Sequence, residues 1–353
     1  MNLVLVAILI IILAVSFIFV TTLSFEKTPL PTDVIDDLPS TGVISTILTT
    51  STVPTTQNLK VAFIGDQGSG NDADSVLHLI SSENADMVLH QGDFDYSDDP
   101  DLWDDKISLI LGEDYPYFAS IGNHDVASWD GYQQKLSERL SRVTGADCSG
   151  DLGINSSCNY MGLFFVLSGV GTMGDGHASF IENELSQTDS IWKICSWHKN
   201  MKSMQLGKKN DSTGWDVYEQ CRINGAIIAT GHEHSYARTK SLSDIQNQIV
   251  HPDYSDQNNL VVAPGTTFVF VSGLGGTGVR DQNRCLPDTY PYGCNGEWAN
   301  IYSLNQDASP GALFCTFYAD DNPAKSSCYF KDIAGNIPDT FGITNFPNGI
   351  SEK

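Results

Sequence analysis

The stretch Gly92-Asp93-Phe94-Asp95-Tyr96 decides the fold that this sequence predicts. The apolar run Asp86-Met87-Val88-Leu89-His90 leads directly into it. A buried strand that ends in this way places a carboxylate at the rim of a parallel sheet, where α/β proteins bind their ligands. The stretch therefore predicts an α/β domain that presents Asp93 at the rim of a sheet.

Four further polar clusters follow similar apolar runs along the chain. They are Gly65-Asp66-Gln67, Gly122-Asn123-His124-Asp125, Trp197-His198-Lys199 and Gly231-His232-Glu233-His234. Each joins a short strand to a turn that carries Asp, Asn or His. One such cluster indicates little, but five in this order predict the loops of a two-metal hydrolase site.

The charge of the chain limits its partners. Its 353 residues include 19 Lys and Arg against 43 Asp and Glu, which gives a formal net charge of −24. A surface this acidic repels polyanions, so we expect no nucleic acid as a specific partner. It would also repel phosphate esters, unless bound cations invert the local field.

The N-terminal part of the sequence predicts a membrane segment and a stalk. Leu3–Val20 is an apolar run without charge, long enough to span a bilayer and longer than the apolar part of most signal peptides. We favour an uncleaved anchor in residues 1–24 over a removed signal peptide. Residues 25–57 are rich in Thr, Ser and Pro and predict an extended stalk. The folded domain would then lie at the cell surface, tethered to the membrane, or be secreted if the segment is cleaved.

One catalytic domain is expected over residues 58–334, followed by a Gly-, Asn- and Pro-rich tail over residues 335–353. Strand-like runs are Lys60–Ile64, Met87–Leu89, Tyr117–Ile121, Leu163–Leu167, Trp192–Ser196, Ala226–Ala229, Phe268–Val271 and Leu313–Tyr318. Amphipathic segments between them include Asp74–Ser82, Gly131–Val143 and Ser179–Leu185. Because strands and helices alternate early and strands dominate later, the order predicts a four-layer α/β/β/α sandwich of two mixed sheets flanked by helices.

Eight cysteines indicate an oxidising compartment. Six form close pairs, and no C-x-x-C zinc pattern occurs, so short-loop disulfides are expected. The pairs are Cys148 with Cys158, Cys285 with Cys294, and Cys315 with Cys328. Cys195 and Cys221 could form a fourth bridge or remain buried thiols, because both flank apolar strands. Sequons at Asn155 and Asn210 are candidate glycosylation sites and agree with export.

The residue types in these loops suit a pair of metal ions. Two ions about 3.5 to 4 Å apart need a shared anion, and Asp93 is the candidate bridge, with Asp66 as a terminal ligand. His232 and His234 flank Glu233, so an extended loop would let one imidazole serve each ion. The remaining candidate ligands are Asn123 and His198. Nitrogen and oxygen ligands without thiolates suit Zn, Mn or Fe.

Taken together, these motifs resemble the signature blocks of the calcineurin-like metallophosphoesterases. Within that superfamily, Gly92-Asp93-Phe94-Asp95-Tyr96 resembles the GDxxY motif of purple acid phosphatases. The run from Gly231 to Arg238 is similar to their GHxHxYxR motif. The resemblance extends from about Leu59 to Thr239, with a looser continuation to about Gly276.

The resemblance implies a ligand set for each of two metal ions. Asp66, Tyr96 and His234 would hold the first, a ferric ion, while Asn123, His198 and His232 would hold the second, with Asp93 shared. The second ion would be Zn, Mn or Fe(II), and a di-zinc or di-manganese centre is the alternative. A Tyr96 phenolate on Fe(III) would give a charge-transfer colour. Without Fe(III), Tyr96 would be an ordinary aromatic residue at the end of a strand.

The expected reaction follows from these charges. Two cations lower the pKa of bound water and supply a hydroxide that attacks phosphorus in line. His124 is expected to contact a phosphoryl oxygen or to protonate the leaving group, with Asp125 or Asp95 holding its other ring nitrogen. The alternative for His124 is a packed loop histidine. Where plant-type purple acid phosphatases carry a further histidine, this chain has lysines up to Lys208-Lys209, which weakens the expectation of an acid optimum.

The sequence therefore predicts an exported, two-metal phosphohydrolase that acts on small phosphate monoesters. A phosphodiesterase or nucleotide hydrolase using the same site is the first alternative. A non-catalytic surface module that kept the fold is the second, and it is disfavoured because the predicted ligands and acid residues are all present.

Overall fold

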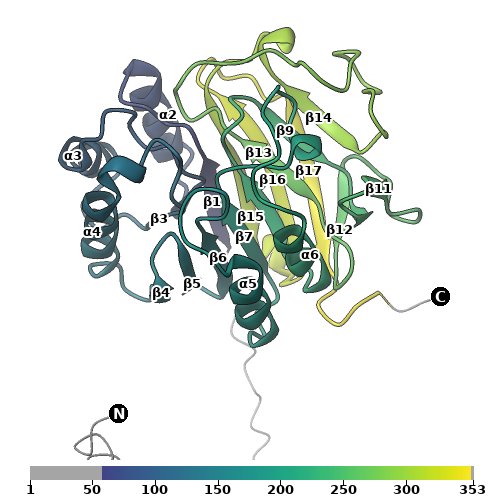
Figure 1. Ribbon diagram of the computed structural model, residues 1–353, viewed down its shortest axis with the longest axis horizontal. Coiled ribbons are helices and arrows are strands. Elements are labelled where there is room, and N and C mark those ends of the chain that lie inside the picture. Colours follow the sequence, from purple (N-terminus) through teal and green to yellow (C-terminus); the bar gives the residue numbers. More distant parts are fainter. Residues whose placement is uncertain (1–57, 351–353) are drawn as a thin grey trace, which may run out of the picture. The chain divides into compact units, whose positions relative to one another are not determined.

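Two β-sheets form the centre of the computed structural model, which describes residues 58–350 (Figure 1). The first sheet has seven strands in the order β12 (Asn259–Val262), β17 (Asp339–Asn345), β16 (Lys325–Asp332), β15 (Gly311–Phe317), β1 (Leu59–Ile64), β2 (Met87–His90) and β3 (Tyr117–Ala119). The second has eight in the order β14 (Trp298–Tyr302), β9 (Tyr236–Thr239), β13 (Val269–Ser272), β8 (Ile227–Thr230), β7 (Lys193–Trp197), β6 (Leu163–Ser168), β5 (Asn155–Tyr160) and β4 (Asp147–Asp151). A hairpin, β10 (Leu242–Asp244) and β11 (Ile249–Val250), stands apart from both.

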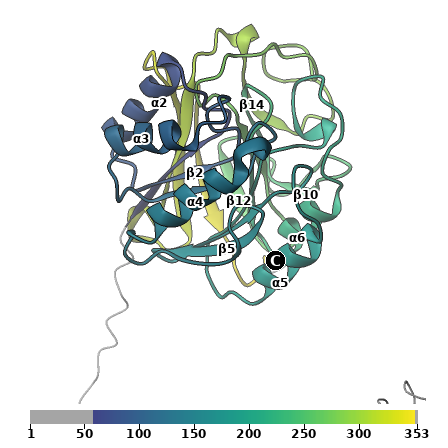
Figure 2. The same ribbon diagram turned by 60° about the vertical axis from the view of Figure 1, so that its left-hand side comes forward.

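Helices cover the outer face of each sheet (Figures 1 and 2). The helices on the first sheet are α2 (Asn71–Ser82), α3 (Pro100–Ile110) and α4 (Trp129–Leu140). Those on the second are α5 (His177–Ser186) and α6 (Asp216–Ile223). One apolar core fills the space between the sheets, and a further core lies under each set of helices. The predicted four-layer sandwich is therefore confirmed.

Strand β1 shows why the strands could be found from apolar runs. Leu59, Val61 and Phe63 face the core between the sheets, while Ala62 and Ile64 face the helices. Since side chains alternate between the two faces of a strand, a strand with helices on one side and a sheet on the other is apolar throughout. The eight predicted strand-like runs all coincide with strands of the two sheets.

Helix α3 lies in an acidic segment and was not among the amphipathic segments predicted from the sequence. The helix begins after Asp99, whose carboxylate accepts a hydrogen bond from Leu102 N at 3.0 Å, with Pro100 in its first turn. Both features stabilise a helix start, because they occupy or remove backbone N–H groups that lack a partner there. Trp103 and Ile107 supply its buried face.

The expected tail after residue 334 is wrong. Strand β17 lies between β12 and β16 in the first sheet, and Phe341 and Ile343 contribute to the core between the sheets. The buried Asp339 accepts hydrogen bonds from Arg238 Nε at 2.8 Å and Nη2 at 2.9 Å. Glycine, asparagine and proline dominated the composition of this segment, but the alternation of Asp339, Phe341 and Ile343 was its strand signal.

Four disulfides join the eight cysteines: Cys148–Cys158, Cys195–Cys221, Cys285–Cys294 and Cys315–Cys328. The bridge left open by the sequence, Cys195–Cys221, ties β7 to α6. The predicted anchor (1–24) and stalk (25–57) lie outside the described residues. Among residues 58–350, no helix has the length and apolar character needed to cross a membrane.

Candidate metal centre

The predicted ligands lie on loops that leave β1, β2, β3, β7 and β8 and meet in space. Asp66 N donates to Gly92 O at 3.0 Å, which joins the first two loops. Gly231 N donates to His198 O at 3.1 Å, which joins the last two. His232 N donates to Asp66 Oδ2 at 2.8 Å and connects the two sheets across the site.

Glycines let the loops after β2 and β3 touch. A Cβ on Gly122 would lie 2.0 Å from Asp93 N, and one on Gly92 would lie 2.5 Å from Gly122 N. Both distances are far below van der Waals contact, so neither position accepts a side chain without moving the backbone.

Four site residues have left-handed backbone conformations. They are Asp66 (φ 57°), Asp93 (φ 60°), Tyr96 (φ 60°) and His232 (φ 70°). L-residues other than glycine rarely adopt this region, and such strain concentrates at functional sites. The surrounding hydrogen bonds hold this costly geometry in place.

The first group of side chains centres on the Tyr96 hydroxyl. It lies 3.1 Å from Asp66 Oδ1, 3.1 Å from Asp93 Oδ2 and 3.3 Å from His234 Nε2. His234 Nε2 itself lies 3.2 Å from Asp66 Oδ1. Four potential ligand atoms, one each from Asp66, Asp93, Tyr96 and His234, thus lie close together and come from three loops.

The second group shares Asp93 with the first. His198 Nε2 lies 3.2 Å from Asp93 Oδ2 and 3.0 Å from His232 Nδ1. Ligand atoms of Asp93, His198 and His232 all lie within 4.8 Å of one another, which is compatible with one metal ion. The His198 Nδ1–H donates to Gln91 O over 2.7 Å, so Nε2 is the nitrogen left to coordinate.

Electrostatics hold the two aspartates charged. Burial opposes the charge of Asp93, but the positive charge and hydrogen bond of His198 keep the pKa of Asp93 well below its usual value. Burial likewise opposes the charge of Asp66, and the hydrogen bond from His234 lowers its pKa. Burial and the neighbouring carboxylates raise the pKa of Tyr96 far above its usual value. Cations placed among these groups would reverse that last effect.

The donor set fits two metal ions. Asn123 Oδ1 is buried and has no hydrogen-bond partner among the described residues, and it adjoins His124, whose N–H donates to Asp93 Oδ1 at 2.9 Å. Carboxylate, imidazole, phenol and amide donors without a thiolate are ligands for Zn, Mn and Fe. Asp93 thus lies between Asp66, Tyr96 and His234 on one side and His198 and His232 on the other.

A family model described as calcineurin-like phosphoesterase matches residues 59–236, half of the chain. The chain belongs to the calcineurin-like phosphoesterase family. The matched residues contain every ligand loop described above. No curated protein matches the sequence.

Solved structures share the fold of this chain. The purple acid phosphatase PPD1 from yellow lupin (Lupinus luteus) seeds has 17% identity and a TM-score of 0.57, over 82% of this chain and 54% of that one. PhoD has 13% identity and a TM-score of 0.53, over 83% and 70%. GAP50, the anchor in the inner membrane complex of Plasmodium, has 10% identity and a TM-score of 0.53, over 81% and 89%. The chain thus spans about half the length of the lupin protein.

The predicted acid residues have other partners than expected. Asp125 accepts hydrogen bonds from the backbone N–H groups of Asp93, Phe94 and Gly122 at 2.7 to 2.9 Å. It therefore fixes the loops that carry the ligands. Among residues 58–350 no hydrogen bond links it to His124, so its expected role as partner of that ring is wrong.

Asp95 likewise does not hold His124. Its carboxylate accepts from Tyr132 OH at 2.5 Å, Ser97 N at 2.8 Å and Asp99 N at 3.1 Å, which fastens the end of the loop to α4. The exposed His124 packs its ring against Tyr96, with 4.5 Å between ring centroids.

Two cations lie beside the predicted metal ligands. Lys209 Nζ donates to the carbonyl oxygen of His232, and Arg280 Nη1 donates to the same oxygen at 3.2 Å. Burial lowers the pKa of Lys209 to about 8. The sequence analysis noted Lys208-Lys209 only as lysines that stand where a further histidine was expected, and it gave no signal for Arg280, which comes from a loop far along the chain.

The two sequons differ in accessibility. The Asn155 amide donates to Asp175 O at 2.9 Å, and its Oδ1 lies 2.7 Å from His177 Nδ1. Asn210 lies exposed in the loop after β7. Of the two predicted glycosylation sites, Asn210 is therefore the more accessible side chain.

Proposed function

We propose that this chain is a two-metal hydrolase of small phosphate monoesters. The proposal rests on one observation, namely that Asp93 is shared by two groups of side chains with metal-ligand chemistry. Phosphoester hydrolases with two ions need such a shared carboxylate, since an anion between the ions screens their repulsion. Membership of the calcineurin-like phosphoesterase family supports the reaction class.

The side chains have separate tasks in this proposal. When bound, the metal ions activate a water molecule and neutralise charge on the phosphoryl group. Asp66, Tyr96 and His234 would hold one ion, and Fe(III) there would make the protein coloured. Asn123, His198 and His232 would hold the other, as Zn, Mn or Fe(II).

Protein groups outside the ligand set orient the reactants. Gln91 O fixes the ring of His198, and Asp125 fixes the backbone of the Asp93 loop. His124 is exposed beside the ligands, so a substrate at the metal centre can contact its imidazole directly. We assign it the contact to a phosphoryl oxygen or the proton for the departing alkoxide.

Export is part of the proposal. Four disulfides are typical of proteins that fold outside the reducing cytosol. The apolar segment in residues 1–24 would anchor the enzyme at the cell surface. Fractionation of cells that express the full chain tests this point: the enzyme should stay with membranes after a high-salt wash and be released by detergent.

The unpartnered oxygen of Asn123 offers the most direct test of the two-metal reaction. The purified full chain should contain two metal ions and hydrolyse p-nitrophenyl phosphate faster than bis-p-nitrophenyl phosphate. Asn123→Ala should lower the metal content towards one ion per chain and reduce kcat/KM by about 100-fold or more. Asp101→Asn, a change at an exposed carboxylate of α3, is the matched control. Full metal content without hydrolysis of either ester would refute the proposal.

A further inference from the structure

Cations without a carboxylate partner are distributed unevenly in this acidic protein. Among residues 58–350 eight lysines and arginines make no ion pair: Lys193, Lys199, Lys202, Lys208, Lys209, Lys240, Arg284 and Lys325. Five of the eight lie in the loop 199–209 or at Arg284. A net charge of −24 would supply partners for cations placed at random, so this grouping needs another explanation.

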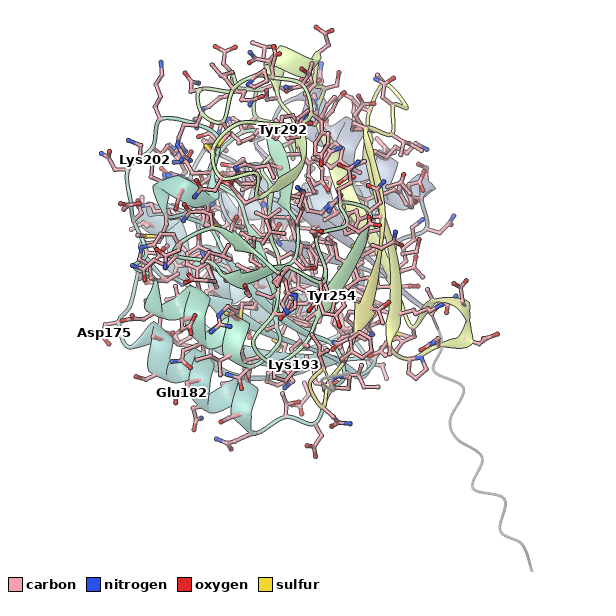
Figure 3. All side chains as sticks on the ribbon, turned by 90° about the vertical axis from the view of Figure 1, so that its right-hand side faces the viewer. Asp175, Glu182, Lys193, Lys202, Tyr254 and Tyr292 are labelled. Atoms are coloured by element: carbon pink, nitrogen blue, oxygen red, sulfur yellow. A yellow bond between two sulfur atoms is a disulfide. The ribbon has the colours of Figure 1, made fainter. Side chains whose placement is uncertain are left out.

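The loop 199–209 is fastened to the loop that follows β13. Asn283 N and Arg284 N donate to Leu206 O at 2.9 and 3.0 Å, and Arg284 Nη1 donates to Gln205 O at 2.7 Å. The Cys285–Cys294 disulfide closes the second loop. Figure 3 shows Lys202 and Tyr292 in the upper part of the domain and Lys193 in the lower part. The basic side chains therefore lie on loops that hydrogen bonds and a disulfide hold in place.

One of these cations, Lys209, meets a further cation, Arg280, at the edge of the metal centre. Lys209 and Arg280 both donate to the carbonyl oxygen of His232, a predicted metal ligand. Two positive charges on one neutral oxygen repel each other. Glu233 Oε2 lies 3.8 Å from Arg280, while no carboxylate of the described residues forms an ion pair with Lys209. An anion bound between them would relieve this repulsion, because each cation would then gain an opposite charge.

We propose that Lys209 and Arg280 bind a second phosphate group of the substrate, next to the phosphate that is cleaved. This inference rests on the proposed function and extends its substrates from monoesters to phosphoric anhydrides with two adjacent phosphates, such as inorganic diphosphate or nucleoside diphosphates. Water adds its oxygen to the terminal phosphorus, and the bond from that phosphorus to the bridging oxygen breaks. The departing phosphate keeps the electron pair and takes up the proton that the water releases.

Binding of phosphonates tests this subsite without any reaction. Methylenediphosphonate and methylphosphonate are titrated calorimetrically into the metal-loaded full chain, with metal content measured after each titration. The wild type should bind the diphosphonate about 10-fold or more tightly than the monophosphonate, since two more charged hydrogen bonds form. In Lys209→Gln and Arg280→Gln this ratio should fall to about threefold or less. Lys209→Arg should keep the ratio, as should Lys193→Gln, which removes an unpaired cation in the lower part of the domain in Figure 3.

Hydrolysis then separates this inference from the proposed function. With diphosphate, kcat/KM should fall about 10-fold or more in Lys209→Gln and Arg280→Gln, and with p-nitrophenyl phosphate it should change less than about threefold. Adenosine diphosphate as a further substrate distinguishes a nucleotide from a free diphosphate. If both variants keep the binding ratio, or weaken both phosphonates equally, the subsite is refuted while the hydrolase stands. If the binding ratio responds as expected but the wild type cleaves no ester or anhydride, the hydrolase fails and the subsite stands.

Discussion

Two buried aspartates, Asp93 and Asp339, have opposite surroundings. Asp339 receives two hydrogen bonds from the Arg238 guanidinium and one from Tyr236 OH at 2.6 Å. Its charge is therefore compensated within the protein. Asp93 faces His198 and the Tyr96 hydroxyl, which it shares with a second carboxylate, Asp66.

This difference in surroundings distinguishes a residue that stabilises the fold from residues that are suited to bind a ligand. A buried charge costs free energy unless a partner neutralises it, and at Asp339 the protein supplies that partner. At Asp93 and Asp66 one backbone N–H donates to each carboxylate, and the neighbouring side chains are imidazoles and a phenol, which are metal ligands as well as hydrogen-bond donors. We therefore expect mutations at the two sites to affect different properties.

The largest expected effect is the loss of activity in Asp93→Asn. A neutral amide cannot screen two cations, so kcat/KM for p-nitrophenyl phosphate should fall about 1000-fold or more. The free energy of unfolding of the metal-free protein should change by no more than about 1 kcal/mol, because the partner that remains, His198, is an imidazole that can lose its proton and leave no unpaired buried charge. Steady-state kinetics and denaturant unfolding measure the two quantities. An unfolding free energy that falls by several kcal/mol would show that Asp93 mainly stabilises the fold.

The converse variant, Asp339→Asn, should lose stability. It leaves the fully buried Arg238 without its anion, so the free energy of unfolding should fall by about 3 to 5 kcal/mol. Metal content of the folded fraction should stay at the wild-type level. The double variant Arg238→Met, Asp339→Leu should recover part of the loss, since it removes both charges. A double variant less stable than Asp339→Asn would contradict the charge argument.

These two aspartates also mark what the sequence can predict. Asp93 follows an apolar strand within the same short stretch, so local order along the chain was sufficient to assign it. The partner of Asp339 lies 101 residues away, and no local pattern connects Arg238 with a segment rich in glycine and asparagine. The sheet position of β17 therefore went unpredicted, although its own alternation was visible.

The same distinction applies within the site. The residue types of the ligands and their order were readable, because each loop carries its own strand and turn. The contacts of Asp95 and Asp125 were not, because a carboxylate beside a histidine in sequence can turn instead to backbone N–H groups of another loop. Left-handed conformations at Asp66 and His232 were also invisible, since neither is glycine.

Removal of metal should affect the wild type and Asp93→Asn unequally. Ions that bind only the folded state stabilise it by about 3 kcal/mol when their concentration is 100 times the dissociation constant. A chelator should therefore lower the free energy of unfolding of the wild type by about that amount. Asp93→Asn should respond by less than half as much. Thermal unfolding with and without chelator, at fixed protein concentration, gives both values; equal responses would mean that the stabilising ions bind elsewhere.

The smallest effect concerns a third carboxylate, Glu83, which is compensated as Asp339 is but lies near the surface. Lys331 Nζ lies 2.6 Å and Lys60 Nζ 3.2 Å from its oxygens, and Tyr329 OH donates to it as well. Partial burial opposes the charge, yet the hydrogen bonds of Lys331 and Tyr329 lower the pKa of Glu83 to about 2. Glu83 follows α2 directly, so these contacts link the end of α2 to β1 and β16.

Because the pKa of Glu83 is lower in the folded than in the unfolded protein, its contribution to stability is complete above pH 4.5 and is lost as the pH falls towards 2. Solvent screens this cluster, so we expect Glu83→Gln to cost only about 1 kcal/mol at pH 6. The gap between variant and wild type should close between pH 4.5 and 2. Urea unfolding at several pH values measures it, and taking the difference between the two proteins cancels the titration of all other carboxylates. A gap that is constant over this range would mean that Glu83 stabilises the fold through packing and not through its charge.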